Sequence, residues 1–391
     1  NRQRALVAGV VALLLLGSAG VFAWRRGADN GTAAVTPATP RIAVLPFENR
    51  GDTSDAYFAD GMTDAVRGKL SQLPGIEVVA RTSTSPYLGS NKTPTEIARE
   101  LGAQYLLTAV VRFDRRSGDV GVVHLTPELV EVTTNGTPTT RWQQSFDHPL
   151  TDVFEVQGQI AEQVASRMRV ALASGTNATL AEAPTTNPRA YDAFLRGEAF
   201  REQMDIDGNR EALRHLETAV ALDSTFGDAW AALATARINV KATGINTSVS
   251  EAEARSIRDD IDKALRFAPN SARPYRALGA YYRLIVGDRA RAQAAYDEGF
   301  RRDPSDAFSL SSAALLNLSR GEFEQAVAKL QQVIRIAPRQ AVHYSRLATA
   351  YIGLGRFEEA EEMARRATAL APGVPVHVAT LASIVLIEGD L

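Results

Sequence analysis

The sequence contains no cysteine among its 391 residues, which excludes several kinds of site at once. Without thiols there is no disulfide scaffold, zinc–thiolate site, iron–sulfur cluster or cysteine nucleophile. A positive charge excess is missing too, because 43 basic residues face 45 acidic ones. This balance argues against a nucleic-acid-binding protein. The five histidines are spread over positions 124, 148, 215, 343 and 377, so a histidine metal cluster is not expected.

Catalytic signatures are missing as well. The sequence has no H-E-x-x-H, no G-x-S-x-G, no phosphate-binding P-loop and no kinase H-R-D or D-F-G motif. We therefore predict no catalytic residue, no cofactor and no metal site, and interpret Asp60 before an apolar helix as a turn and cap residue. An enzyme with an unrecognised pocket in residues 41–174 stays open as an alternative, for which Asp60 and His124 would have to converge.

One long uncharged run, residues 5–24, stands near the start of the sequence and reads ALVAGVVALLLLGSAGVFAW. A helix of this length spans about 30 Å, the thickness of the hydrocarbon core of a bilayer. Two arginines flank the run on each side. We therefore expect residues 1–27 to form a single-pass membrane anchor. A cleaved signal peptide and a buried core helix are the alternatives, and the charges leave the orientation open.

Two segments rich in small, polar and proline residues divide the rest of the chain. Residues 28–40 read ADNGTAAVTPATP and residues 175–186 read GTNATLAEAPTT, and both compositions are typical of linkers. They enclose a block, 41–174, that has an ordinary single-domain size. From 187 to 391 the pattern becomes helical and repetitive.

The block 41–174 alternates between strand and helix patterns. We expect strands over 42–47, 76–80, 105–113, 120–132 and 140–146, and helices over 58–73, 93–102 and 152–172. Thr93 with Glu96 predicts a capping box at the start of one helix, and Asp152 the same role for another. The mixed order predicts a small α/β sandwich with its helices packed on one face of the sheet.

Several segments of this block resemble a known family. They are RIAVLPFENR at 41–50, YFADGMTDAV at 57–66, VVARTSTSPYLG at 78–89, EIARELGAQYLLTAVVR at 96–112 and, after Trp142, DVFEVQGQIAEQVA at 152–165. These segments resemble the domain similar to the amino-terminal part of TolB, over nearly all of 41–174. The resemblance implies a bacterial, extracytoplasmic setting for residues 28–391, after a transmembrane helix and before tetratricopeptide repeats. It also implies an upstream receptor-type Ser/Thr kinase, nucleotide cyclase or winged-helix DNA-binding domain, of which we favour the kinase.

Residues 187–391 contain a repeated phrase. Four helical segments end in similar residues followed by proline, at Pro269, Pro304, Pro338 and Pro372. The prolines are 35, 34 and 34 residues apart, and a 34-residue helix–turn–helix period is the signature of the tetratricopeptide family, which this region resembles. We expect an α-solenoid in which small residues such as Gly279, Ala314 and Ala348 let paired helices approach closely. Residues 374–389 predict the first helix of an incomplete last repeat.

Three arginines in the first helix of one repeat share a face. Arg273, Arg276 and Arg283 stand three and then seven residues apart. First helices line the concave groove of tetratricopeptide proteins, so this ladder would hold an acidic peptide or a free carboxylate by bidentate bonds. A solvated basic face, balanced by acidic neighbours, is the alternative that we favour. The three arginines are nevertheless the candidate protein-binding residues.

These features predict a membrane-anchored, non-enzymatic interaction or sensor module whose repeat groove docks a protein or peptide. The setting that we favour is the extracytoplasmic part of a bacterial receptor-type Ser/Thr kinase. A stand-alone cell-envelope scaffold or assembly protein is the main alternative. An enzyme using 41–174 and a transcription regulator whose DNA-binding domain lies elsewhere are the others. We expect no nucleic-acid partner, and the ligand and the oligomeric state are left open.

Overall fold

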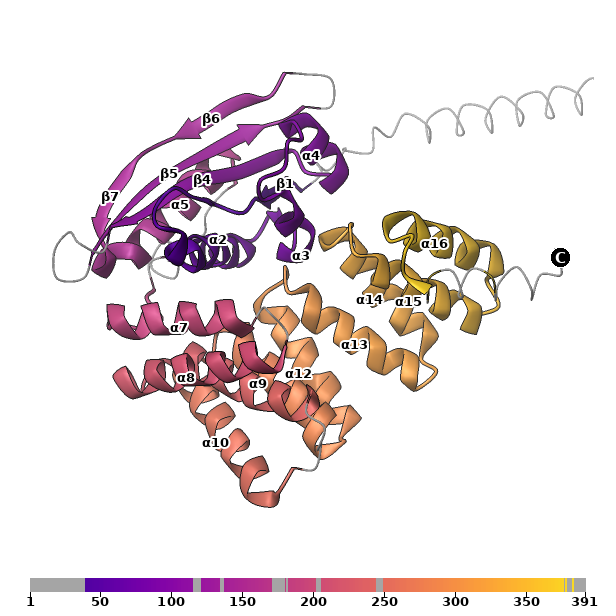
Figure 1. Ribbon diagram of the computed structural model, residues 1–391. Coiled ribbons are helices and arrows are strands. Elements are labelled where there is room, and N and C mark those ends of the chain that lie inside the picture. The colour runs from indigo at the N-terminus through magenta and orange to yellow at the C-terminus, as the bar shows by residue number, and fades with distance from the viewer. Residues whose placement is uncertain are drawn as a thin grey trace, which may run out of the picture. The chain divides into compact units, whose positions relative to one another are not determined.

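The computed structural model describes residues 39–375, except 115–120, 134–136, 171–179, 181, 202–204 and 244–248, together with His377 and Ala382. A mixed β-sheet with flanking helices comes first, and pairs of helices follow it (Figure 1). The expected anchor over 1–27 and most of the linker over 28–40 lie outside the described residues, as does most of the helix expected over 374–389.

The sheet has seven strands in the order β3-β1-β4-β5-β6, with β2 also paired to β4 and β7 to β5. The pairs β1–β3, β1–β4 and β2–β4 are parallel, whereas the pairs that β5 forms with β4, β6 and β7 are antiparallel. The strands are β1 Arg41–Val44, β2 Glu48–Asn49, β3 Glu77–Val78, β4 Tyr105–Asp114, β5 Val122–Glu131, β6 Thr139–Gln143 and β7 Phe146–Pro149.

Helices cover both faces of this sheet. Helices α2 (Ala56–Ser71) and α5 (Val153–Arg167) share a buried cluster with Ile42 and Leu107, and α4 (Pro94–Leu101) shares another with Ala43 and Leu106. Neighbouring strand residues point to opposite faces. Strands β1 and β4 are therefore apolar on both sides and need cover on both. The prediction that all helices pack on one face was wrong for this reason.

Two other local predictions also failed. The expected strand over 140–146 is divided into β6 and β7, and the break lies opposite Pro127, whose carbonyl accepts a 3.4 Å hydrogen bond from the Gln144 N–H. Proline has no N–H to donate in return, so the ladder is interrupted there. Asp152 makes no side-chain cap on α5. The capping box of Thr93 and Glu96 on α4 is confirmed.

After the sheet region, residues 188–370 of the described chain form paired helices. The first helices of the pairs are α7 Pro188–Arg201, α9 Gly227–Thr243, α11 Ala272–Tyr281, α13 Ala307–Ser319 and α15 Ala341–Gly353, and the second helices are α8 Ile206–Leu222, α10 Glu251–Phe267, α12 Arg289–Arg302, α14 Phe323–Ile336 and α16 Phe357–Leu370. Helix α11 continues into a short π-helix, η4 (Tyr282–Val286). The remaining short helices are η1 Thr53–Asp55, α3 Arg81–Thr84, η2 Ser85–Tyr87 and η3 Leu150–Asp152.

The repeated proline phrase marks the ends of the second helices. Helices α10, α12, α14 and α16 each end two residues before one of the four prolines, as expected because proline cannot continue a helix. The predicted close approach of the paired helices is also confirmed. A Cβ atom on Gly279 would lie 2.6 Å from the ring of Tyr296 on α12, which only a glycine permits.

The sheet region and the repeats share one buried cluster. The ring of Tyr191 on α7 meets Phe154 on α5 edge to face, with centroids 4.6 Å apart. Gly61 on α2 leaves room for Leu195, because a Cβ atom there would lie 2.4 Å from the leucine side chain. Helix α7 is therefore packed on α2 and α5 as well as on its partner α8.

The expected fold class needs one correction. No helix among the described residues is long and apolar enough to cross a bilayer. The described architecture is a sheet region followed by a helical solenoid, and the expected transmembrane helix and single-pass membrane localisation are not supported. Both expectations rested on residues 5–24, which lie outside the described residues.

Candidate functional site

The first helices of successive repeats lie side by side. Helix α9 contacts α11, and α13 contacts α15. Between these two pairs, Arg276 on α11 lies 3.4 Å from Asp306 at the start of α13. We call the surface formed by α9, α11 with η4, α13 and α15 the first-helix face.

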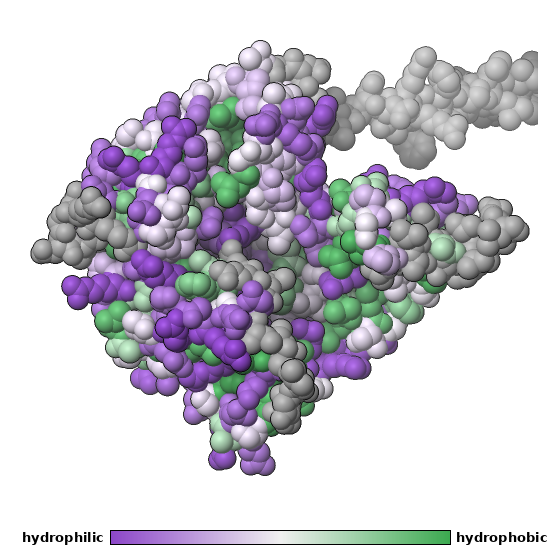
Figure 2. Space-filling view, viewed as in Figure 1, coloured by the Kyte–Doolittle hydropathy of each residue, from purple (hydrophilic) through white to green (hydrophobic). Residues whose placement is uncertain are grey.

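Large apolar side chains are exposed on the first-helix face. Phe308 is 50% exposed and Leu315 is 36% exposed. They stand seven residues apart on α13, so they share one side of the helix. Figure 2 shows such apolar residues set among hydrophilic ones over the surface of the repeats. An apolar pair next to charged groups is typical of a surface that binds another molecule.

Arg273 is not a free member of the predicted arginine ladder. Its Nη1 donates a 2.6 Å hydrogen bond to Glu198 on α7, and its guanidinium lies 5.2 Å from the centre of the Phe194 ring. Burial by itself would raise the pKa of Glu198. The positive charges of Arg201 and Arg273 and their hydrogen bonds outweigh this effect and hold the pKa of Glu198 well below its usual range. The arrangement is a half-buried structural ion pair that ties α11 to α7.

Arg276 and Arg283 have different neighbours from Arg273. The guanidinium of Arg276 lies 5.7 Å from the centre of the Phe308 ring, beside its weak ion pair with Asp306. Asp306 already caps α13 by accepting from the backbone of Phe308 and Ser309. Arg283 lies in η4, near the hydroxyl of Tyr296 on α12. Among the described residues, neither of these two arginines forms an ion pair as short as the 2.6 Å contact of Arg273 with Glu198.

A fourth arginine, which the sequence reasoning missed, lies on α15 of the first-helix face. The Nη1 of Arg346 donates a 2.5 Å hydrogen bond to the hydroxyl of Ser311 on α13. The same hydroxyl oxygen lies 3.3 Å from Nδ1 of His343. Burial, and then Arg346, lower the pKa of His343 to about 4. The proline period aligns Arg346 with Ala277, the residue after Arg276, so a search for arginines within one helix could not find it.

The two residues proposed for an enzymatic pocket do not converge. Asp60 lies on α2, and burial raises its pKa while Arg81 opposes the rise. His124 lies on β5 and pairs with Asp147 on β7. Its neighbours Val123 and Leu125 point into the core that α2 shares, so His124 points to the opposite face of the sheet. The sheet therefore separates the two side chains.

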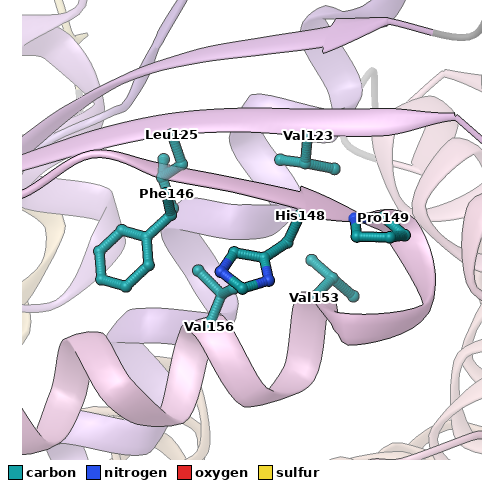
Figure 3. Close-up of a pocket in the computed structure, with 7 residues that line it drawn as sticks. All are labelled: Val123, Leu125, Phe146, His148, Pro149, Val153 and Val156. Atoms are coloured by element: carbon teal, nitrogen blue, oxygen red, sulfur yellow. The ribbon is translucent and has the colours of Figure 1, made fainter. Parts of the chain in front are cut away.

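The hollow beside β5 offers no polar site either. It lies between β5, β7 and α5 and is lined by Val123, Leu125, Phe146, His148, Pro149, Val153 and Val156. Figure 3 shows the imidazole of His148 among these apolar side chains. The gap is too small to hold a water molecule. Within the described residues, no group of three or more acidic or histidine side chains is placed to bind a metal ion.

Comparisons with known proteins bear mainly on the repeats. Residues 317–384 match the family model described as tetratricopeptide repeat. Similar solved structures include PilW, a widely conserved type IV pilus biogenesis factor, at 16% identity and a TM-score of 0.43 over 52% of this chain and 88% of that one. Another is YrrB, a repeat protein with an unusual peptide-binding site, at 16% identity and a TM-score of 0.36 over 54% of this chain and 98% of that one.

A relative in sequence is a protein of Rhizobium meliloti (strain 1021) named putative adenylate cyclase 3. It is 32% identical over 198 residues, which are 50% of this chain and 32% of the relative. The chain thus spans about a third of the length of that protein. The described helix pairs, the proline spacing and the family match together show that the carboxy-terminal part of this chain is an array of tetratricopeptide repeats, the architecture of a protein–protein interaction module.

Proposed function

We propose that this chain is a non-catalytic docking module that binds a protein or peptide segment on its first-helix face. The observation that carries the proposal is the exposed Phe308, whose ring lies under the Arg276 guanidinium and on the same side of α13 as the exposed Leu315. Aromatic and arginine side chains supply much of the energy of protein interfaces. A peptide segment bound along α11, α13 and α15 would bury the two apolar side chains and the arginine together.

The test compares matched pairs of apolar residues on the two kinds of helix. One variant of the full chain carries Phe308→Ser and Leu315→Ser on the first-helix face. The control carries Phe267→Ser and Leu370→Ser, which are 38% and 37% exposed on second helices. We expect the first variant to lose the captured partners of the unmodified protein and the control to keep them. Equal capture by both, with unchanged thermal unfolding, would contradict the proposal.

We further propose that the docking module works within a signalling protein. Two observations support this setting: the 198-residue similarity to a protein named putative adenylate cyclase 3, and the resemblance of residues 41–174 to the TolB amino-terminal domain. A Ser/Thr kinase or a nucleotide cyclase would be the signalling enzyme. Sequencing of the gene on both sides of this region tests the idea. A cyclase or kinase domain in the same reading frame supports it, and a complete reading frame without one contradicts it.

A further inference from the structure

The sheet region is attached to the repeats at two places of different character. At the first, α7 packs on α2 and α5 within a shared apolar cluster. At the second, the end of α14 and the turn after it meet residues 80–83 and Glu100. We call this second contact the clasp, with residues 80–83 and Glu100 on one side and residues 336–340 on the other.

One part of the clasp caps the end of α14. The Ala80 N–H donates a 2.7 Å hydrogen bond to the carbonyl of Ile336, the last residue of that helix. Beside it, the guanidinium of Arg41 on β1 donates to the carbonyl of Arg335. The last four carbonyls of a helix have no partner within it. Water can therefore replace both donors when the clasp opens, so that little free energy is lost.

The other hydrogen bonds of the clasp are made by the turn after α14. The backbone N–H of Arg339 donates to the Ser83 hydroxyl oxygen at 3.3 Å, and its guanidinium forms a 2.6 Å ion pair with Glu100. The Gln340 side chain donates a 2.7 Å hydrogen bond to the Thr82 carbonyl. The side chains of Arg339 and Glu100 are 32% and 23% exposed, and ion pairs that water reaches contribute little to stability.

The clasp buries little apolar surface of the sheet region. Among the described buried residues, Ala80 is the sheet region's member of the cluster at this contact, and the other members come from α13, α14 and the turn after it. At the α7 attachment, by contrast, the rings of Tyr191 and Phe154 meet in the core. Because hydrophobic stabilisation grows with the apolar area that is buried, the clasp is the weaker attachment and the one that opens first.

The clasp also positions part of the first-helix face. Ala80 shares its cluster with Ala307 and Leu310, which flank Phe308 on α13. Gln340 is the residue that precedes α15 as its N-cap. A solenoid changes its curvature through small rotations between neighbouring repeats. Attachment at α7 and again at the clasp therefore fixes the curvature of the repeats between them, and with it the relative positions of α11 and α13.

We propose that the clasp is a releasable contact that regulates docking. When it is closed, it holds the repeats at the curvature in which the first-helix face binds a protein segment. When it is open, the helix pairs from α13 onward move away from the sheet region and binding weakens. This inference rests on the proposed docking function and adds its regulation. Because coupling between two equilibria is reciprocal, a docked segment in turn stabilises the closed clasp.

Two substitutions open the clasp by different means. Arg339→Glu places a second negative charge opposite Glu100. Ala80→Pro removes the N–H donor of the clasp at a residue whose φ of −63° already suits proline. Arg210→Glu on α8 is the matched control, because it reverses the charge in a 3.0 Å ion pair with Asp207 that lies within one helix and outside the clasp.

Double electron–electron resonance on the full chain measures the opening without any partner. Spin labels are attached to cysteines that replace Thr95 on α4 and Ala369 on α16 or, in a second protein, Thr95 and Ala221 on α8. All three residues are exposed, and the sequence has no other cysteine. We expect a narrow 95–369 distance distribution in the unmodified and control proteins and a broader, longer one in both clasp variants, with the 95–221 distances unchanged.

Two results would overturn the clasp as a releasable contact. One is a 95–369 distribution that neither clasp substitution changes. The other is a 95–221 distribution that broadens as much as the 95–369 one, because the whole unit would then loosen rather than the clasp. Circular dichroism melting shows that each labelled variant is folded.

Photo-crosslinking then tests whether the clasp regulates docking. The photoreactive amino acid p-benzoylphenylalanine replaces Phe308 in the unmodified, clasp-variant and control chains. We expect the yield of partner adducts to fall at least fivefold in both clasp variants and to stay unchanged in Arg210→Glu. An unchanged or higher yield in variants with lengthened distances overturns the regulation. A lack of adducts from every protein contradicts the docking function instead, and the distances still decide whether the clasp opens.

Discussion

At the scale of single residues, charges on the repeats have different roles according to their partners. Arg273 and Arg276 stand three residues apart in one helix, yet Arg273 forms a 2.6 Å ion pair with Glu198 while Arg276 lies 3.4 Å from Asp306. The sequence predicts that both lie on one face. It cannot show that a glutamate about 75 residues earlier reaches only one of them, because tertiary packing decides that.

The Glu198–Arg273 pair gives a prediction about stability. Replacing Glu198 with Gln leaves a half-buried arginine with a weaker partner, so we expect the free energy of unfolding to fall by about 3 kcal/mol at pH 7. Because the folded state lowers the pKa of Glu198, its contribution is complete above the ordinary glutamate pKa near 4.3 and is lost as the pH falls below it. Urea unfolding of both proteins at pH 7 and at pH 3.5 checks this. A difference that stays the same at both pH values would contradict it.

His343 gives a second prediction. Burial, then Arg346, lower its pKa to about 4, so its neutral form is the one that the fold stabilises. This contribution is present above the ordinary histidine pKa near 6.5 and is lost as the pH falls from there towards 4. We expect the His343 ring proton, assigned by its loss in His343→Gln, to keep its NMR shift from pH 8 to pH 5.5. A midpoint near 6.5 would show that the side chain is exposed.

At the scale of elements, the sequence is most informative where the signal is local. The capping box of Thr93 and the prolines that follow second helices are confirmed because each acts within a few residues. The division between β6 and β7 was missed because it depends on Pro127 in a neighbouring strand. The cover of α4 over the second sheet face was missed because a continuous apolar run does not say which helix buries which side.

The helix pair α11–α12 gives a prediction at this scale. Gly279→Ala would place a methyl group 2.6 Å from the fully buried ring of Tyr296, so the helices must separate and we expect a loss of about 1–3 kcal/mol. Gly68→Ala on α2 is the matched control, since no atom lies within 4 Å of its new Cβ. We expect it to gain about 0.5–1 kcal/mol from helix propensity alone. Thermal unfolding measures both, and equal effects would argue against close packing of the pair.

At the scale of the whole described unit, residues far apart in the sequence are joined. The Ala80 N–H donates a 2.7 Å hydrogen bond to the Ile336 carbonyl, and Gln340 donates to the Thr82 carbonyl, also at 2.7 Å. Arg339 completes the contact with a 2.6 Å hydrogen bond to Glu100. The sheet region is thus fastened to the turn after α14 as well as packed on α7. No local sequence pattern signals such a contact, because its residues are far apart along the chain.

This contact gives a further prediction. A double-mutant cycle with Glu100→Ala and Arg339→Ala should show a coupling energy of about 1 kcal/mol, the value typical of a half-exposed ion pair. Urea unfolding of the four proteins supplies the numbers. If the two single effects simply add, the side chains do not interact in solution.

The central claim is that the first-helix face of the repeats binds a protein segment, and site-specific photo-crosslinking tests it most directly. The photoreactive amino acid p-benzoylphenylalanine replaces Phe308 in one full-length protein and Phe267 in another, and each is irradiated in cells. We predict covalent adducts to a partner from position 308 and none to the same partner from position 267. Adducts from position 267 alone, or equally from both, would contradict the claim.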